Sequence, residues 1–241
     1  MLEARPQKRR DHQKRKKRAK KKSKTSFTQL FFVSKTLRVL ITGTPSVGKT
    51  TIAKEVAKIL DYHYVDVAKT IIEKQMYVEV DGERGSFIVN VEKARRFFSS
   101  FLKKLSNAIL DTHIVELFPR RLIDKVIVLR AHPLLILKRG MERGWPLKKS
   151  LENAQAELLG VCLFDALSFY GREKVWQVNC TCRSIEQVVS EVLDILEGKG
   201  GGRDIDWLEE LERDGRLDLL LELEKACDLP ENLFELLRYC R

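Results

Sequence analysis

The stretch from Val39 to Thr51 constrains this chain most, because it joins a short apolar run to a glycine loop and a helix-forming segment. The loop reads Gly-x-x-x-x-Gly-Lys-Thr. Gly43 and Gly48 let the backbone curl so that successive N–H groups converge on an anion. Lys49 adds a positive charge, and the helix that follows directs the positive end of its dipole at the same point. The pattern predicts a loop that binds the phosphates of a nucleotide.

Two oxygen-bearing side chains predict a magnesium ion at this loop. The Thr50 hydroxyl stands next to the motif lysine, where it can ligate Mg²⁺. Asp111 ends the apolar run 108–110. We expect that run to lie beside the strand that carries the loop, so that the carboxylate can hold a water on the same ion. An apolar run that ends in aspartate is common, and by itself it indicates little.

The positive charge of the chain is concentrated near its N-terminus. Residues 1–24 hold 13 Lys and Arg against two acidic residues, which equals the formal net charge of +11 for all 241 residues. Such a block cannot form a core, and it predicts a disordered basic tail over residues 1–30. Three interpretations stay open: contact with an RNA backbone, a solvated tail without a specific partner, and translation that starts nearer Val33.

The apolar runs and the cysteines of the sequence also indicate the cellular compartment of the protein. No uninterrupted apolar run approaches the ~20 residues of a membrane helix, and we expect no signal peptide and no membrane partner. The five cysteines are an odd number, and a lone Cys-x-Cys at 180–182 lacks the further ligands of a metal site. We therefore expect free thiols and a cytoplasmic protein, or a nuclear one in a eukaryote.

Segments typical of strands and helices alternate between residues 37 and 196. Strands are expected at 37–42, 62–67, 108–111, 125–129 and 174–178, and helices at 49–60, 68–76, 91–105, 133–142, from about 150 to 170, and 184–196. Residues 77–90, with a turn signal at Asp81-Gly82, are expected to form a mobile loop. Connections this long allow crossovers, so we expect an α/β fold, a parallel sheet of about five strands with helices on both faces.

Composition divides the chain into four parts. After the tail, residues 36–197 form the phosphate-loop domain, and the glycine run 198–202 is expected to be a flexible linker. Residues 203–241 carry 12 acidic and 6 basic residues with leucines at helical spacing, which predicts a helical extension. The extension is suited to docking on the core, binding a partner or pairing with the basic tail, and the sequence does not choose among these.

A basic helix face provides candidate ligands for the phosphates. Lys138, Arg139 and Arg143 lie on and just after the helix expected at 133–142. Arg139 and Arg143 are four residues apart, so both guanidinium groups face one side and can straddle a triphosphate.

Several motifs together resemble one known family. In order they are GTPSVGKTT, DTH at 111–113, LFP at 117–119, VIVLR at 126–130 and RGWPLKKSLENAQAE at 143–157. They resemble the atypical adenylate kinases of archaea and eukaryotic nuclei, which are P-loop enzymes similar to nucleoside monophosphate kinases. Members of that family also hydrolyse ATP and assist maturation of the small ribosomal subunit. The resemblance covers about residues 37–196.

The resemblance implies roles for the residues that match its motifs. The resemblance assigns ATP binding to Ser46, Gly48, Lys49, Thr50, Thr51 and Arg143, and the basic helix face adds Arg139 to this set. Asp111 and His113 match the motif that replaces an ordinary Walker B carboxylate. Asp111 then serves Mg²⁺ through water, and His113 orients a water or a phosphate. Arg143 opens a short lid over ATP, residues 142–152. The catalytic set is Lys49, Asp111, His113 and Arg143.

The acceptor side departs from the family. Residues near 66–90 correspond to the segment that closes over the acceptor monophosphate, and the candidate ligands are Asp66, Asp81, Glu83 and Arg130. Ala68-Lys69 stands where the family usually shows Gly-Asp, and residues 81–85 replace an acidic run. Ser46 stands where glycine is common, so it needs a backbone angle that a side chain tolerates.

The expected function is phosphoryl transfer from MgATP to AMP, with ATP hydrolysis and a role in the maturation of the small subunit and its rRNA. One alternative is an ATP-hydrolysing assembly factor, with a ribosomal protein and rRNA as partners and only vestigial kinase activity. Another is a small-metabolite kinase on the same scaffold. A monomer is favoured.

Overall fold

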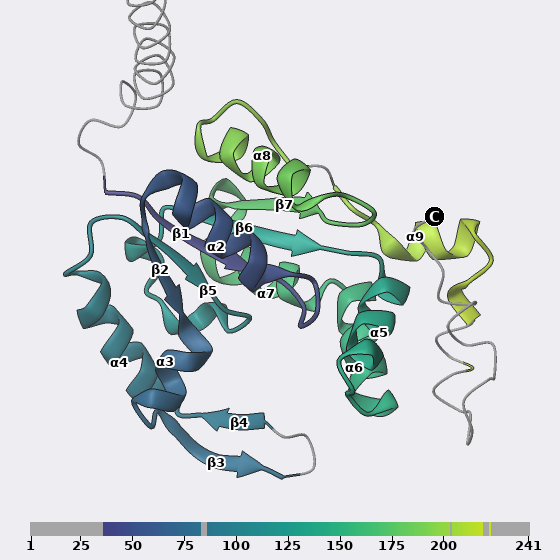
Figure 1. Ribbon diagram of the computed structural model, residues 1–241, viewed down its shortest axis with the longest axis horizontal. Helices are drawn as coiled ribbons and strands as arrows, with labels where there is room; N and C mark the ends of the chain where they lie inside the picture. The colour runs from purple at the N-terminus through teal and green to yellow at the C-terminus, as the bar shows by residue number, and fades with distance from the viewer. Residues whose placement is uncertain (1–35, 83–85, 203, 219–221, 223–241) are drawn as a thin grey trace, which may run out of the picture. The chain divides into compact units, whose positions relative to one another are not determined.

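The computed structural model describes residues 36–82, 86–202, 204–218 and 222, and its centre is a five-stranded sheet (Figure 1). The strands are β1 (Arg38–Thr42), β2 (His63–Asp66), β5 (Ala108–Asp111), β6 (Lys125–Arg130) and β7 (Val175–Asn179). Their order is β2-β5-β1-β6-β7, and every neighbouring pair is parallel. The expected α/β fold is therefore confirmed.

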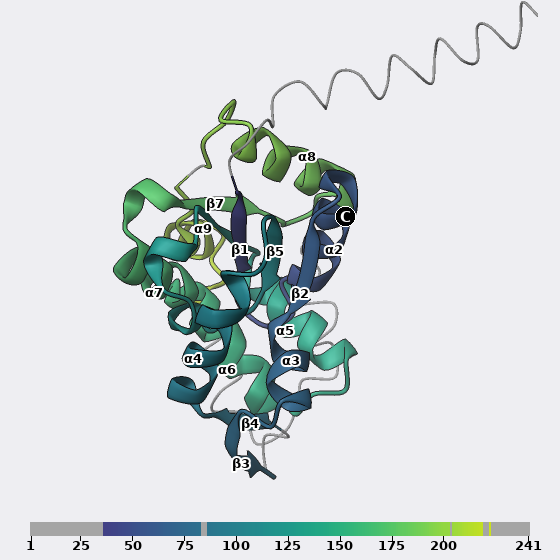
Figure 2. The ribbon, with the colours of Figure 1, turned by 90° about the vertical axis from the view of Figure 1, so that its left-hand side faces the viewer.

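Helices cover both faces of this sheet (Figure 2). The α-helices of the described residues are α2 (Lys49–Leu60), α3 (Val67–Glu73), α4 (Val91–Leu102), α5 (Pro133–Glu142), α6 (Leu147–Leu158), α7 (Val161–Tyr170), α8 (Ile185–Leu196) and α9 (Trp207–Arg213). Side chains from α2 and α8 share one apolar cluster with Val39 and Ile41, and side chains from α3, α4 and α7 share another with Leu40. Because successive side chains of a strand point to opposite faces, a strand covered on both sides is apolar throughout.

The described residues between positions 77 and 89 form two paired strands, which corrects the expected mobile loop. Strand β3 (Tyr77–Asp81) pairs antiparallel with β4 (Ser86–Val89), apart from the main sheet. The rings of Tyr77 and Phe87 lie 4.7 Å apart across the pair. Residues of high strand propensity on both sides of the turn therefore pair with each other rather than with the main sheet.

The segment expected to be one long helix up to Tyr170 is two helices. Gly160 separates α6 from α7 and has a φ of 65°, a left-handed conformation that glycine adopts at little cost. The break redirects the chain. As a result α6 packs against α5, whereas α7 packs against the sheet.

The C-terminal part of the described chain lies on the core. Trp207 and Leu211 of α9 are buried, and Leu211 joins an apolar cluster with Leu134 and Leu151. No helix among the described residues combines the length and apolar character of a membrane-crossing segment. The predicted basic tail, residues 1–30, lies outside the described residues.

Candidate active site

The phosphate loop follows β1 and has the curled backbone that its glycines predict. Gly43, Ser46 and Gly48 have φ values of 140°, 73° and 110°. A Cβ at Gly43 would lie 2.3 Å from the backbone oxygen of Leu129, so a side chain is excluded there. Ser46 takes a left-handed conformation that residues with a side chain rarely adopt, which corrects the expectation of a readily tolerated angle there.

Lys49 points into this loop. Its ammonium group donates to the backbone oxygens of Gly43 at 2.8 Å and Thr44 at 3.1 Å. Burial lowers the pKa of Lys49 below its usual value, and the nearby charge of Asp111 opposes that shift. The two carbonyl oxygens hold the cation inside the curve of the loop.

Asp111 lies directly beside the loop because β5 pairs with β1, with Ile41 opposite Asp111. Its Oδ2 accepts hydrogen bonds from the Thr50 hydroxyl at 2.6 Å and from the Tyr64 hydroxyl at 3.1 Å. Burial and then the charge of Asp111 raise the pKa of Tyr64. A hydroxyl and a carboxylate are the hard oxygen donors that suit Mg²⁺, so these residues fit the ion.

His113 follows two residues after Asp111 and faces the same space. The preceding Thr112 is buried, and its hydroxyl accepts a hydrogen bond from the amide of Ile114 at 3.0 Å, which fixes the turn. Burial by the cleft walls and the charge of Lys49 lower the pKa of His113 to about 4, although the side chain is exposed to the cleft. The imidazole is therefore neutral near pH 7.

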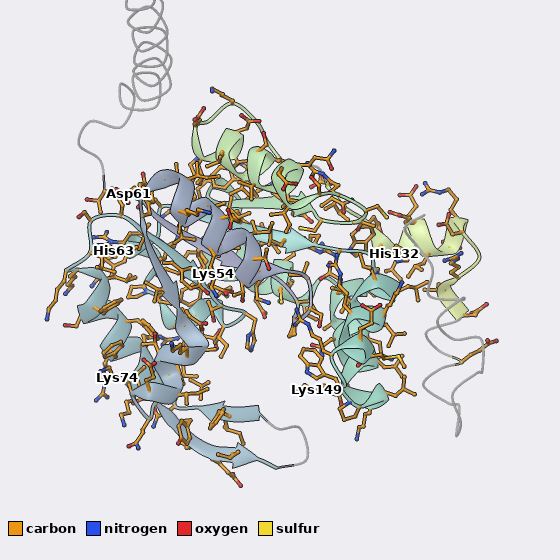
Figure 3. All side chains as sticks on the ribbon, viewed as in Figure 1. Lys54, Asp61, His63, Lys74, His132 and Lys149 are labelled. Atoms are coloured by element: carbon orange, nitrogen blue, oxygen red, sulfur yellow. The ribbon has the colours of Figure 1, made fainter. Side chains whose placement is uncertain are left out.

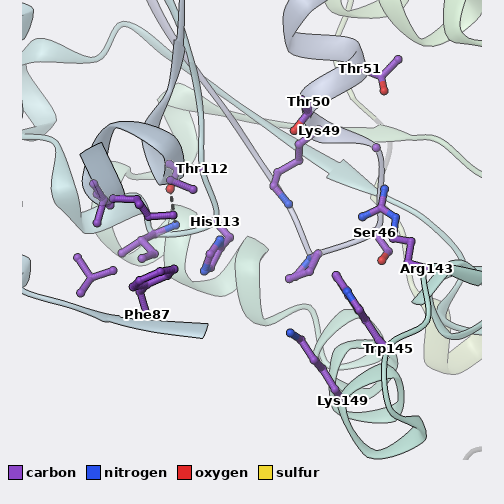
Figure 4. Close-up of a pocket in the computed structure, with 17 residues that line it drawn as sticks. Ser46, Lys49, Thr50, Thr51, Phe87, Thr112, His113, Arg143, Trp145 and Lys149 are labelled. Carbon is purple, nitrogen blue, oxygen red and sulfur yellow. Dashed lines mark hydrogen bonds between the residues drawn. The ribbon is translucent and has the colours of Figure 1, made fainter. Parts of the chain in front are cut away.

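A cavity of about 530 Å³ brings most of the expected residues together (Figure 4). Its loop side is lined by Ser46, Gly48, Lys49, Thr50 and Thr51, and Thr112 and His113 also line it. The hairpin side is mostly apolar, with Ala68, Ile71, Ile72, Phe87, Val89 and Ile114. The cavity therefore joins a polar phosphate end to an apolar wall.

Three lid residues complete this cavity: Arg143, Trp145 and Lys149. The Arg143 guanidinium lies 5.7 Å from the centre of the Trp145 indole, and the Lys149 ammonium lies 4.8 Å from it. Figure 3 shows Lys149 on the α6 side of the cleft. Two cations stacked on one aromatic ring keep positive charge close to the loop.

A second cavity of about 220 Å³ lies on the other side of the loop and shares Ser46, Gly48, Thr51 and Arg143 with the first. Arg139 lines it and donates to the backbone oxygen of Val47 at 3.1 Å. The other side is formed by Cys180, Arg183, Ile185 and Val188. Sequence reasoning missed this side. The available signal was that residues 180–185 follow the carboxyl end of a strand in the parallel sheet.

The residues expected to bind the acceptor are not gathered in the cavity. Asp66 caps α3 by accepting from the amide of Lys69, and Asp81 ends β3. Glu83 lies outside the described residues. Arg130 is 2% exposed and donates to Glu157 at 2.7 Å, so it does not line the cavity. This placement argues against a role for Arg130 in acceptor binding.

The described cysteines are not all free. Cys162 and Cys180 carry free thiols, as expected, whereas Cys182 is disulfide-bonded, which corrects the expectation for that residue. No group of three or more His, Cys, Asp or Glu able to hold a metal occurs within the described part of the chain.

The loop, the parallel sheet and the Thr50–Asp111 pair define a P-loop nucleotide-binding protein. A family model described as "AAA domain" matches residues 39–160. Proteins named "Putative adenylate kinase" are 35% identical over 174 residues in Methanocaldococcus jannaschii and 39% identical over 173 residues in Pyrococcus abyssi. These alignments cover 72% and 71% of this chain, and 94% and 91% of those proteins. The chain belongs to the family of these archaeal proteins and is a P-loop kinase, an ATP-dependent phosphotransferase.

Proposed function

We propose that this protein transfers the γ-phosphoryl group of MgATP to AMP and hydrolyses ATP when no acceptor is bound. The observation that carries the proposal is one cavity in which Lys49, Thr50 and His113 face a separate apolar wall, with Asp111 hydrogen-bonded to Thr50 behind the lining. Phosphoryl transfer depends on positioning and on charge around the moving group more than on a protein nucleophile. The cavity supplies both, together with room for a second substrate.

We assign a role to each polar or charged side chain at the phosphate end of the cavity. Lys49 exchanges the carbonyl oxygens of Gly43 and Thr44 for the β- and γ-phosphates. The Thr50 hydroxyl and, through water, Asp111 hold Mg²⁺, which neutralises charge on the phosphate oxygens when it is bound. Arg143 brings the lid charge to the phosphoryl group in transit. Neutral His113 orients the attacking water or the acceptor phosphate.

The two cavities divide the substrates between them. The smaller one lies beyond the loop, and its lining by Ile185, Val188 and Arg139 suits the adenine and ribose of ATP. The hairpin side of the larger one, with Phe87 and Ile72, suits the base of the acceptor. Aromatic and aliphatic side chains accept a flat purine with favourable contact area. The two nucleotides therefore meet at His113 and Lys49.

The basic N-terminal segment favours a second candidate, an assembly factor whose ATP hydrolysis drives release from a small-subunit ribosomal protein or rRNA. Thirteen Lys and Arg within residues 1–24 suit an RNA backbone. The apolar acceptor wall is compatible with this function too, because hydrolysis needs no acceptor. In this case the kinase reaction is vestigial.

A nucleotide panel separates these functions. Each nucleoside monophosphate is added to MgATP, with and without a small-subunit ribosomal protein, and ADP is measured. A kinase forms ADP much faster with AMP than from ATP alone. Equal rates with and without every monophosphate contradict the kinase and leave hydrolysis. Removal of residues 1–24 is the matched test for RNA, since it should lower RNA affinity and flatten its salt dependence.

A further inference from the structure

A buried carboxylate links the phosphate loop to the segment that follows the glycine run. Glu157 of α6 is 1% exposed. Its Oε2 accepts a hydrogen bond from the hydroxyl of Thr44, inside the loop, at 2.5 Å. Its Oε1 accepts from the Trp207 indole N–H of α9 at 2.9 Å and from Arg130 at 2.7 Å. One side chain therefore connects the loop, β6 and the C-terminal segment.

Trp207 is held firmly in this position. It is 1% exposed, its indole lies 5.6 Å from the His132 ring in an edge-on arrangement, and the Arg130 guanidinium lies 5.9 Å from its centre. Figure 3 shows His132 at the junction between β6 and α9. Trp207 also lies beyond residues 39–160, which the family model matches. The Trp207 indole thus comes from outside residues 39–160, whereas its hydrogen-bond partner Glu157 lies within them.

Gly202 and the start of α9 are each anchored as well. A Cβ at Gly202 would lie 2.0 Å from the backbone oxygen of Gln177 in β7, so the end of the glycine run presses against the sheet. Asp206 caps α9 by accepting from the amides of Leu208 and Glu209. Leu211, one helical turn after Trp207, is fully buried. The expected flexible linker therefore ends in a docked segment.

The hydrogen bond from the Trp207 indole affects the phosphate loop through the position of the Glu157 carboxylate. A buried carboxylate is stable only while its oxygens are hydrogen-bonded and its charge is paired. Loss of the indole N–H leaves Oε1 with Arg130 and the amide of Ala131 and lets the carboxylate shift towards them. Thr44 belongs to the loop that has to close on phosphates. A shift of Glu157 is therefore transmitted to Thr44.

We propose that Trp207 is a positioning residue for the phosphate loop. Docking of α9 fixes Glu157 through the indole N–H, Glu157 fixes Thr44, and the loop is held ready for the triphosphate. Release of α9 from the core weakens nucleotide binding. This inference rests on the proposed binding of MgATP.

Calorimetric titration of the full chain with a non-hydrolysable MgATP analogue tests it. Trp207→Phe keeps an aromatic ring and removes the N–H, and we expect affinity to fall about fivefold, the lower end of couplings between sites. Leu208→Ala is the matched control, because Leu208 lies on the same helix and is 44% exposed. The control should bind as the wild type does. If the wild type fails to bind, the proposed function fails; if it binds and Trp207→Phe binds equally well, this inference fails.

A double-mutant cycle separates positioning from general destabilisation. Thr44→Val removes the hydroxyl that contacts Glu157 and nearly preserves the side-chain shape. If the effect of Trp207 passes through Glu157 to Thr44, the double variant binds no more weakly than Thr44→Val alone. Additive losses overturn the proposal. Gly202→Ala, which displaces the approach to α9, provides a second variant, and it should lose affinity in the wild-type background but not in Thr44→Val.

Discussion

The hydroxyl of Thr50 donates to Oδ2 of Asp111 across 2.6 Å and joins the first turn of α2 to the end of β5. The contact exists because β5 is the parallel neighbour of the strand that carries the loop. The same oxygen accepts from the Tyr64 hydroxyl, on the next strand. Three elements thus present oxygen atoms at one point beside Lys49, which is the point assigned to Mg²⁺.

Replacing Asp111 by Asn should lower ADP formation by about 10–100-fold, the usual cost of losing a group that orients metal-bound water. The carboxylate charge is lost while the shape is kept. Tyr64→Phe is the matched control, because it removes one donor and leaves the carboxylate, and it should have a smaller effect. Rates measured over a Mg²⁺ titration check the prediction, since Asp111→Asn should need more Mg²⁺. An unchanged Mg²⁺ dependence would contradict the assignment.

Replacing Lys49 by Ala should slow both transfer and hydrolysis by roughly 10²–10³-fold. The ammonium inside the loop is the positive charge assigned to the β- and γ-phosphates, and losing such an electrostatic contact costs roughly 10²–10³-fold in rate. ADP release from MgATP is measured with and without AMP. The exposed Lys58, at the other end of α2, is the control, and Lys58→Ala should leave both rates unchanged. Turnover retained in Lys49→Ala would mean that the loop is wrongly assigned.

The sheet and the phosphate loop could be predicted because their signals are local. Residues 39–41 form an uninterrupted apolar run, and such a run indicates a strand covered on both faces. The loop motif then specifies a strand before it and a helix after it. The position of Asp111 followed from the same reasoning, since parallel strands bring their carboxyl ends to one edge of the sheet.

Other features depend on contacts between distant parts of the chain, which no local pattern shows. In the sequence, Arg130 is a basic residue at the end of an expected strand. It is buried because its guanidinium pairs with the carboxylate of Glu157, 27 residues later. In the sequence, Trp207 belongs to the expected helical extension. Its indole N–H donates to Glu157, which lies 50 residues earlier in the chain. The second cavity likewise needs the loop and residues 180–185 to be side by side. The hairpin was missed because its strand pattern is interrupted by a polar, glycine-containing turn.

Replacing His113 by Gln should slow hydrolysis of ATP in the absence of acceptor by about 10²-fold, the lower end for a positioned proton-transfer group. Binding of MgATP should change little, because the loop residues stay intact. Since the pKa of His113 is lowered to about 4, the imidazole stays neutral down to about pH 5 in the free protein. Hydrolysis by the wild type should therefore show no loss centred near pH 6.5. A loss at that pH that disappears in His113→Gln would contradict the lowered pKa.

Stability should fall in mild acid because of His132. Its side chain is fully buried, and Nδ1 accepts from the amide of Leu134 at 3.3 Å, which requires an unprotonated nitrogen. Burial and then Arg216 lower its pKa to about 4, while Asp214 opposes the shift. The unfolded chain takes up this proton near its ordinary value of about 6.5. Between these two values the unfolded state binds more protons, so stability decreases as pH falls.

The contribution of His132 to the loss in the free energy of unfolding is of the order of 2 kcal/mol between pH 7 and pH 5. Urea unfolding at both values measures it. His132→Asn is the matched variant, because asparagine still offers an acceptor to the amide of Leu134 but does not titrate. It should be less stable than the wild type at pH 7 and lose less between pH 7 and pH 5. Equal losses in the two proteins would show that another group is responsible, since His113 titrates alike in both.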